Sequence, residues 1–99
     1  MSLDLAILND DGTINQSKIL TVADHQALCE AAKPINKFPF ISRLMDYYED
    51  AEYNKSEVSF FRIEIQQIIL PELENCIQGL LDLCDFAIAN SKGIIAIAD

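Results

Sequence analysis

An apolar repeat in the C-terminal third of the chain constrains the fold more than any other feature. Its members recur three and four residues apart: Leu73, Cys76, Ile77, Leu80, Leu81, Cys84, Ala87 and Ile88. This spacing places them on one face of a helix, and that face has to be buried. Residues 90–93 end this helix, because Asn and Gly accept the left-handed conformation of a cap. The apolar run 94–98 then predicts an interior strand that is covered on both faces.

Two further strands are predicted at the N-terminus. In residues 3–8 the odd-numbered positions are all leucine or isoleucine, an alternation typical of a strand. An Asp-Gly pair ending at Gly12 indicates a turn, because glycine adopts positive φ without strain. Residues 14–20 then return as the second strand of a hairpin, and Lys18 favours an edge position for it.

Helices are predicted for the middle of the chain. Thr21 caps the first of them, which Pro34 ends because a residue before proline avoids helical angles. Pro39 is suited to the first turn of a short helix, although the number of helices in that region stays open. Asn54 caps a longer helix that ends or kinks at Pro71.

The predicted order of elements is β-β-α-(α)-α-α-β, which is an α+β fold. We expect a small three-stranded sheet, made of the N-terminal hairpin and the C-terminal strand, packed against three to four helices. A chain of 99 residues forms one hydrophobic core, and no repeat or linker divides it. Residues 1–99 are therefore predicted to form a single α+β domain.

The chain is strongly acidic. It has 7 lysines and arginines against 16 aspartates and glutamates, which gives a formal net charge of -9. Nucleic acid and anionic membranes repel such a chain, so we expect neither as a partner. No apolar run approaches the ~20 residues that span a bilayer, and no signal peptide is visible. The protein is therefore expected in the cytoplasm.

The sequence lacks the motifs of catalytic and metal sites. Its one histidine, His25, and its three cysteines, Cys29, Cys76 and Cys84, do not have the spacing of a zinc site. We expect the cysteines to be buried as small hydrophobic residues and His25 to lie on a helix surface. His25 and Cys29 are one helical turn apart, but packing is the favoured role for Cys29. The prediction is a protein that is not an enzyme and binds no cofactor or metal.

Residues 46–53 combine carboxylates with tyrosines. The candidate partner-binding residues are Asp46, Tyr47, Tyr48, Glu49, Asp50, Glu52 and Tyr53. One interpretation is a solvated connector, because charge runs are usually exposed. The other is a recognition surface, in which tyrosines anchor a partner and acids attract its lysines and arginines. The second is supported if these acids follow a short helix, because the helix dipole disfavours them there and broken local rules often mark functional sites.

The turn at 9–12, the segment 46–53 and the ending 93–99 together resemble small acidic bacterial proteins of uncharacterised function. In size and acidity the chain also resembles the immunity proteins of bacterial toxin systems. The second resemblance implies a non-enzymatic protein-binding module, in its most concrete form an immunity-type inhibitor of a basic toxin domain. The alternative is a homo-oligomeric structural or regulatory protein, in the simplest case a homodimer.

Overall fold

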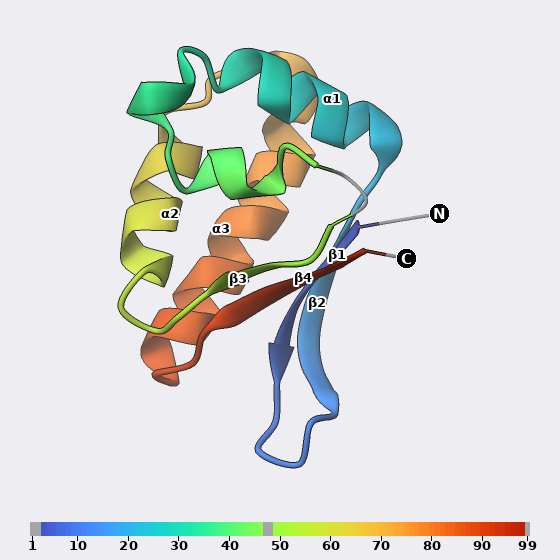
Figure 1. Ribbon diagram of the computed structural model, residues 1–99, viewed down its shortest axis with the longest axis vertical. Coiled ribbons are helices and arrows are strands. Elements are labelled where there is room, and N and C mark those ends of the chain that lie inside the picture. Colours follow the sequence, from blue (N-terminus) through green and yellow to red (C-terminus); the bar gives the residue numbers. More distant parts are fainter. Residues whose placement is uncertain (1–2, 47–48, 99) are drawn as a thin grey trace.

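The computed structural model describes residues 3–46 and 49–98, which form an α+β fold (Figure 1). Its helices and strands are β1 (Leu3–Leu8), β2 (Ile14–Leu20), α1 (Val22–Ala31), β3 (Ala51–Tyr53), α2 (Val58–Gln66), α3 (Glu74–Ala89) and β4 (Ile94–Ala98). Three short 3₁₀ helices complete the described chain: η1 (Ile35–Lys37), η2 (Ile41–Leu44) and η3 (Pro71–Leu73). The α+β class is confirmed, with one strand more than the sequence predicted.

The strands form one antiparallel sheet in the order β2-β1-β4-β3. The N-terminal hairpin is confirmed, since Leu3 pairs with Leu20 and Gly12 in the turn has a φ of 88°. β4 lies beside β1, with Leu3 opposite Ala98, as the sequence predicted. The expected three-stranded sheet is corrected to four strands. β3 has only three residues within an acidic segment, so no alternating pattern marks it.

The α-helices cover one face of the sheet (Figure 1). α3 buries Cys76, Leu80, Leu83, Cys84 and Ala87 against the core. The predicted helix is confirmed, but its buried face is centred closer to Leu83 than the repeat indicated. Ile88 therefore falls outside that face and is exposed.

The segment between α1 and β3 differs from the sequence prediction. The cap of α1 is confirmed, because the Thr21 hydroxyl accepts the N–H of Asp24 at 3.1 Å. Beyond Pro34, however, the chain forms η1 and η2 rather than a short α-helix. Pro39 does not begin a helix of its own; η2 starts two residues later, at Ile41.

The predicted Asn54–Glu57 pair forms in the turn before α2, whose own N-cap residue is Glu57, without a side-chain cap. The Asn54 Oδ1 atom accepts the N–H of Glu57 at 3.0 Å, and Oε1 of Glu57 accepts the N–H of Asn54 at 3.1 Å. This reciprocal pair closes the turn that leads into α2. α2 ends at Gln66 rather than at Pro71, and Ile69 in the following segment is exposed.

Candidate functional site

Four carboxylates of the predicted site are exposed, one on the outer strand β3 and three in the segment before it. We call Asp46, Glu49, Asp50 and Glu52 the acidic edge. Glu52 lies on β3 itself, and Oδ1 of Asp50 accepts the backbone N–H of Ala98 at 2.8 Å, which fixes the entry to β3 against the end of β4. The candidates Tyr47 and Tyr48 lie outside the described residues.

Tyr53 is part of the core rather than of the surface. It lies opposite Ile94 on the face of the sheet that the helices cover, and its side chain is fully buried. The ring stacks on Phe61 with 4.1 Å between centroids, and the hydroxyl donates to the carbonyl of Phe40 at 2.5 Å. Burial raises the pKa of the Tyr53 hydroxyl far above its usual value of 10. The expectation that Tyr53 contacts a partner is therefore corrected, because the alternation of β3 turns it inward.

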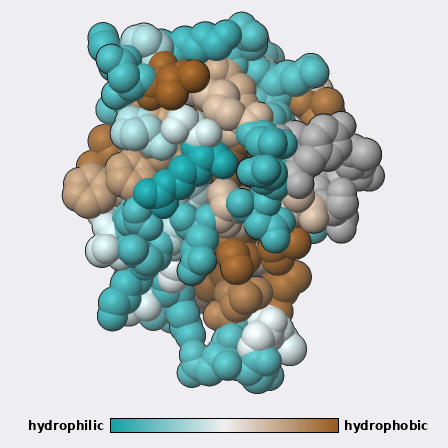
Figure 2. Space-filling model, viewed as in Figure 1, coloured by the Kyte–Doolittle hydropathy of each residue, from teal (hydrophilic) through white to brown (hydrophobic). Residues whose placement is uncertain are grey.

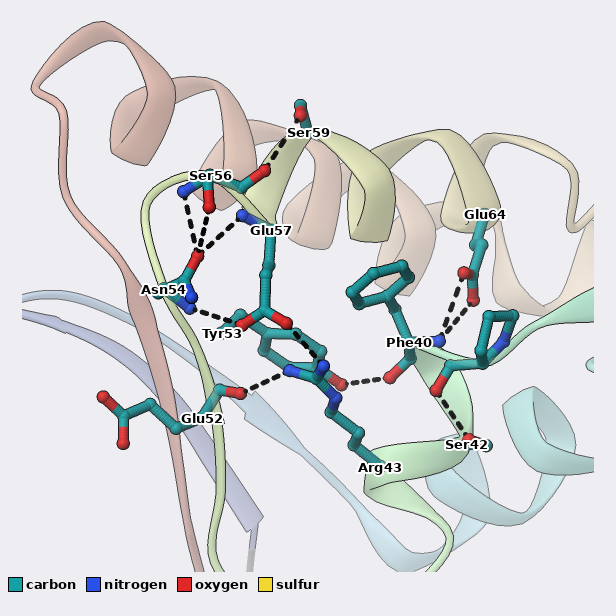
Figure 3. Close-up of polar contacts among 11 residues, drawn as sticks. Phe40, Ser42, Arg43, Glu52, Tyr53, Asn54, Ser56, Glu57, Ser59 and Glu64 are labelled. Atoms are coloured by element: carbon teal, nitrogen blue, oxygen red, sulfur yellow. Dashed lines mark hydrogen bonds and ion pairs between the residues drawn. The ribbon is translucent and has the colours of Figure 1, made fainter.

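Arg43 holds β3 without neutralising the acidic edge (Figure 3). Its guanidinium donates to the backbone carbonyl of Glu52 at 2.9 Å and to Oε2 of Glu57 at 2.5 Å. It also lies 4.9 Å from the ring centre of Phe40 and 5.3 Å from that of Tyr53. The hydrogen bond from Arg43, with a further one from the Asn54 backbone, lowers the pKa of Glu57 to about 2. The charge of Arg43 is thus compensated by Glu57, and the Glu52 carboxylate is left to solvent.

Glu64 is the one carboxylate that is buried among the described residues. Its oxygens accept the N–H groups of Phe40 at 3.0 and 3.1 Å and of Ile41 at 2.9 Å, and so hold the start of η2 (Figure 3). This role of Glu64 was not predicted from the sequence. The available signal was the position of Glu64 beside Ile65 and one turn after Phe61, on the apolar face of α2.

The cations with salt bridges are paired with acids outside the acidic edge. The pairs are Lys33–Glu30 at 3.5 Å, Arg43–Glu57 at 2.5 Å, Arg62–Asp85 at 2.7 Å and Lys92–Asp10 at 2.7 Å. Within residues 3–46 and 49–98, none of these salt bridges involves Glu49, Asp50 or Glu52. The electrostatic field at β3 and the segment before it is therefore negative, and it favours cationic groups of a partner.

The histidine and cysteines do not form a reactive site. His25 is buried rather than on the surface as expected, and its Nε2 atom contacts the Leu44 carbonyl and lies 3.6 Å from the Cys29 sulfur. Burial raises the pKa of Cys29, Cys76 and Cys84, in the last case to about 12, so the thiolate is disfavoured. The described part of the chain contains no cluster of side chains that could hold a metal ion and no helix long and apolar enough to cross a membrane.

The second face of the sheet has no helix packed on it among the described residues (Figure 1). We call this surface the open face, and the strand register assigns to it Asp4, Ala6, Leu8, Ile14, Ser17, Ile19, Glu52, Ile95 and Ile97. The prediction that β4 is covered on both sides is therefore corrected. Ile94 and Ala96 are buried under the helices, whereas Ile95 and Ile97 are only half-buried. Glu52 belongs to both the acidic edge and the open face, so the two surfaces are continuous.

Comparison with known proteins gives a likeness in fold. No family model and no curated protein sequence matches the chain. A solved structure, the Neisseria DNA mimic protein DMP12, superposes with a TM-score of 0.61 over 97% of this chain and 98% of its own. The sequence identity is 14%, so the likeness shows a shared fold over nearly the whole of both chains.

This likeness overturns the partner that the sequence suggested. The expected partner was a toxin domain or a second copy of the chain, but the structural neighbour is a DNA mimic.

Proposed function

We propose that this chain is a non-enzymatic, acidic protein that acts in the cytoplasm and binds a DNA-binding protein at the surface which that protein uses for DNA. The observation that carries the proposal is the acidic edge, whose carboxylates are exposed beside an outer strand. Proteins that bind DNA contact its phosphates with clustered lysines and arginines. Carboxylates held on a folded surface offer the same groups a negative charge.

Three features support this reading. The net charge of -9 favours rapid association with a basic surface. Arg43, the cation that anchors β3, forms its salt bridge with Glu57 and not with the acidic edge. The fold is that of a protein described as a DNA mimic. Together they favour competition with DNA over an enzymatic role.

The experiment is a displacement assay on duplex DNA immobilised on cellulose. Proteins from the source cells are bound to the DNA at fixed salt and then washed with purified chain, or with free duplex DNA as the positive control. We expect the chain to release at least one protein that free DNA also releases. The proposal fails if free DNA releases bound proteins while the chain, at about a hundredfold higher concentration, releases none.

Two double variants locate the surface. E49Q/E52Q removes two charges of the acidic edge, and E72Q/E74Q removes two exposed carboxylates, in η3 and at the start of α3, with the same chemical change. Exposed ion pairs contribute about 0.3–1 kcal/mol each, so E49Q/E52Q should weaken binding to the purified released protein about 3- to 30-fold. E72Q/E74Q should bind like the wild type. Equal losses in both variants would mean that net charge, and not the acidic edge, governs binding.

A further inference from the structure

The open face exposes more apolar surface than the solvent-facing side of an antiparallel sheet usually does. Ile14 and Ile19 on β2 are 55% and 57% exposed. An antiparallel sheet with one solvated face ordinarily places polar residues on that face. In Figure 2 hydrophobic residues gather over the lower half of the strands, with hydrophilic residues above them and at the hairpin turn below.

Carboxylates lie next to these isoleucines in the strand register. Glu52 lies opposite Ile95 on β3 and β4, and Asp4 lies opposite both Ile97 and Ile19 on β4 and β2. Neighbouring strands are about 4.8 Å apart, so each carboxylate is one strand away from an isoleucine. The charge and the apolar surface thus belong to one continuous face.

The lower end of the open face is hollowed. A depression of about 340 Å³ is lined by Leu8, Ile95, Glu52, Lys55 and Lys92, among other residues. The Lys92 ammonium is held by Asp10 at 2.7 Å, so this cation is compensated from within the chain. The depression is large enough to receive a side chain of a partner.

We infer that the open face is the apolar centre of the surface that binds the DNA-binding partner, with the acidic edge as its charged margin. The inference rests on the proposed function and names the partner more narrowly. The DNA-binding site of this partner carries apolar or aromatic side chains between its basic residues. Such side chains stack on bases or insert between base steps when DNA is bound. The isoleucines of the open face contact the partner's side chains that otherwise contact bases. The carboxylates contact the partner's side chains that otherwise contact phosphates.

The test compares two pairs of exposed isoleucines. I14T/I19T lowers the apolar character of the open face, whereas I63T/I69T makes the same change on α2 and the loop after it, where the residues are 51% and 86% exposed. Threonine keeps the branched β-carbon and removes apolar surface. Thermal unfolding of each variant checks that the fold is retained. The readout is the Kd for the protein released from DNA-cellulose, measured at several NaCl concentrations.

We expect I14T/I19T to raise the Kd about tenfold at every salt concentration, because apolar contacts are not screened. E49Q/E52Q should instead flatten the dependence of Kd on salt, and I63T/I69T should change neither quantity. If the wild type binds and E49Q/E52Q weakens binding, but I14T/I19T binds within twofold of the wild type, the inference is refuted and the proposed function stands. If the wild type displaces nothing from DNA, both are refuted.

Discussion

The hydroxyl of Tyr53 allows a quantitative test of how the acidic segment is anchored. Tyr53→Phe keeps the ring stacked on Phe61 and removes the hydrogen bond to the Phe40 carbonyl. An intramolecular hydrogen bond contributes about 0.5–1.5 kcal/mol, and an acceptor left unsatisfied in a buried site costs about 1–3 kcal/mol. We expect the free energy of unfolding to fall by about 1–2 kcal/mol at pH 8, and Tm by roughly 4–16 °C for a domain of this size.

The difference in unfolding free energy between the wild type and Tyr53→Phe should also depend on pH. The pKa of Tyr53 is raised above its ordinary value of 10.0 in the folded protein by burial. At pH 11 the unfolded chain loses this proton and the folded one keeps it, so the wild type loses stability as the pH rises above 10. One pH unit corresponds to about 1.4 kcal/mol. Because phenylalanine has no such proton, the difference between wild type and Tyr53→Phe should shrink or reverse by about 1.4 kcal/mol between pH 8 and pH 11.

Urea unfolding at both pH values measures these differences, and all other titrating groups cancel because the two proteins share them. A difference in unfolding free energy that stays the same at pH 8 and pH 11 would refute the reasoning. It would mean that the Tyr53 hydroxyl ionises as readily in the folded protein as in the unfolded chain, and so that it is not buried.

Three other outcomes are expected. Gly93→Ala should lower the free energy of unfolding by about 1–3 kcal/mol in urea, because the added carbon would lie 2.5 Å from the Tyr53 carbonyl oxygen; wild-type stability would contradict this close approach. Glu57→Gln should be less stable than the wild type at pH 6 by more than at pH 3. The pKa of Glu57, ordinarily 4.5, is lowered to about 2 by its hydrogen bond from Arg43, so its contribution is complete above pH 4.5 and is lost as the pH falls through about 2; an equal difference at the two pH values would exclude the pairing. A thiol reagent at pH 8 should label Cys29 before the two buried cysteines, and a fast phase that survives in Cys29→Ser would show that a buried thiol becomes accessible first.

The elements that were predicted correctly are those whose order is local. The hairpin follows from alternation around Gly12, and α3 follows from a repeat that fits the helical period over four turns. The cap of α1 also depends only on residues three apart, and Thr21 serves as predicted. The Asn54–Glu57 pair forms as well, but in the turn before α2. In each case the partners of a residue are its neighbours in sequence.

The elements that were missed depend on distant contacts. β3 exists because its three residues pair with β4, and no pattern within Ala51–Tyr53 shows this. η2 begins where it does because the Glu64 carboxylate, from another helix, accepts the N–H of Phe40 and of Ile41. A buried carboxylate needs hydrogen-bond donors, but the sequence does not show which residues provide them.

For the candidate site, the sequence by itself determined that a cluster of acids at 46–52 exists and that the chain has a negative net charge. Only the tertiary structure decided which of these residues face solvent. Pairing with β4 turns Tyr53 into the core and Glu52 outward, because successive residues of a strand point to opposite faces. The same pairing brings Glu52 beside Ile95, more than forty positions further along the chain, and so joins charge and apolar surface on one face. Local sequence encodes the helices and the hairpin, whereas a surface assembled across strands depends on long-range pairing that only the folded chain specifies.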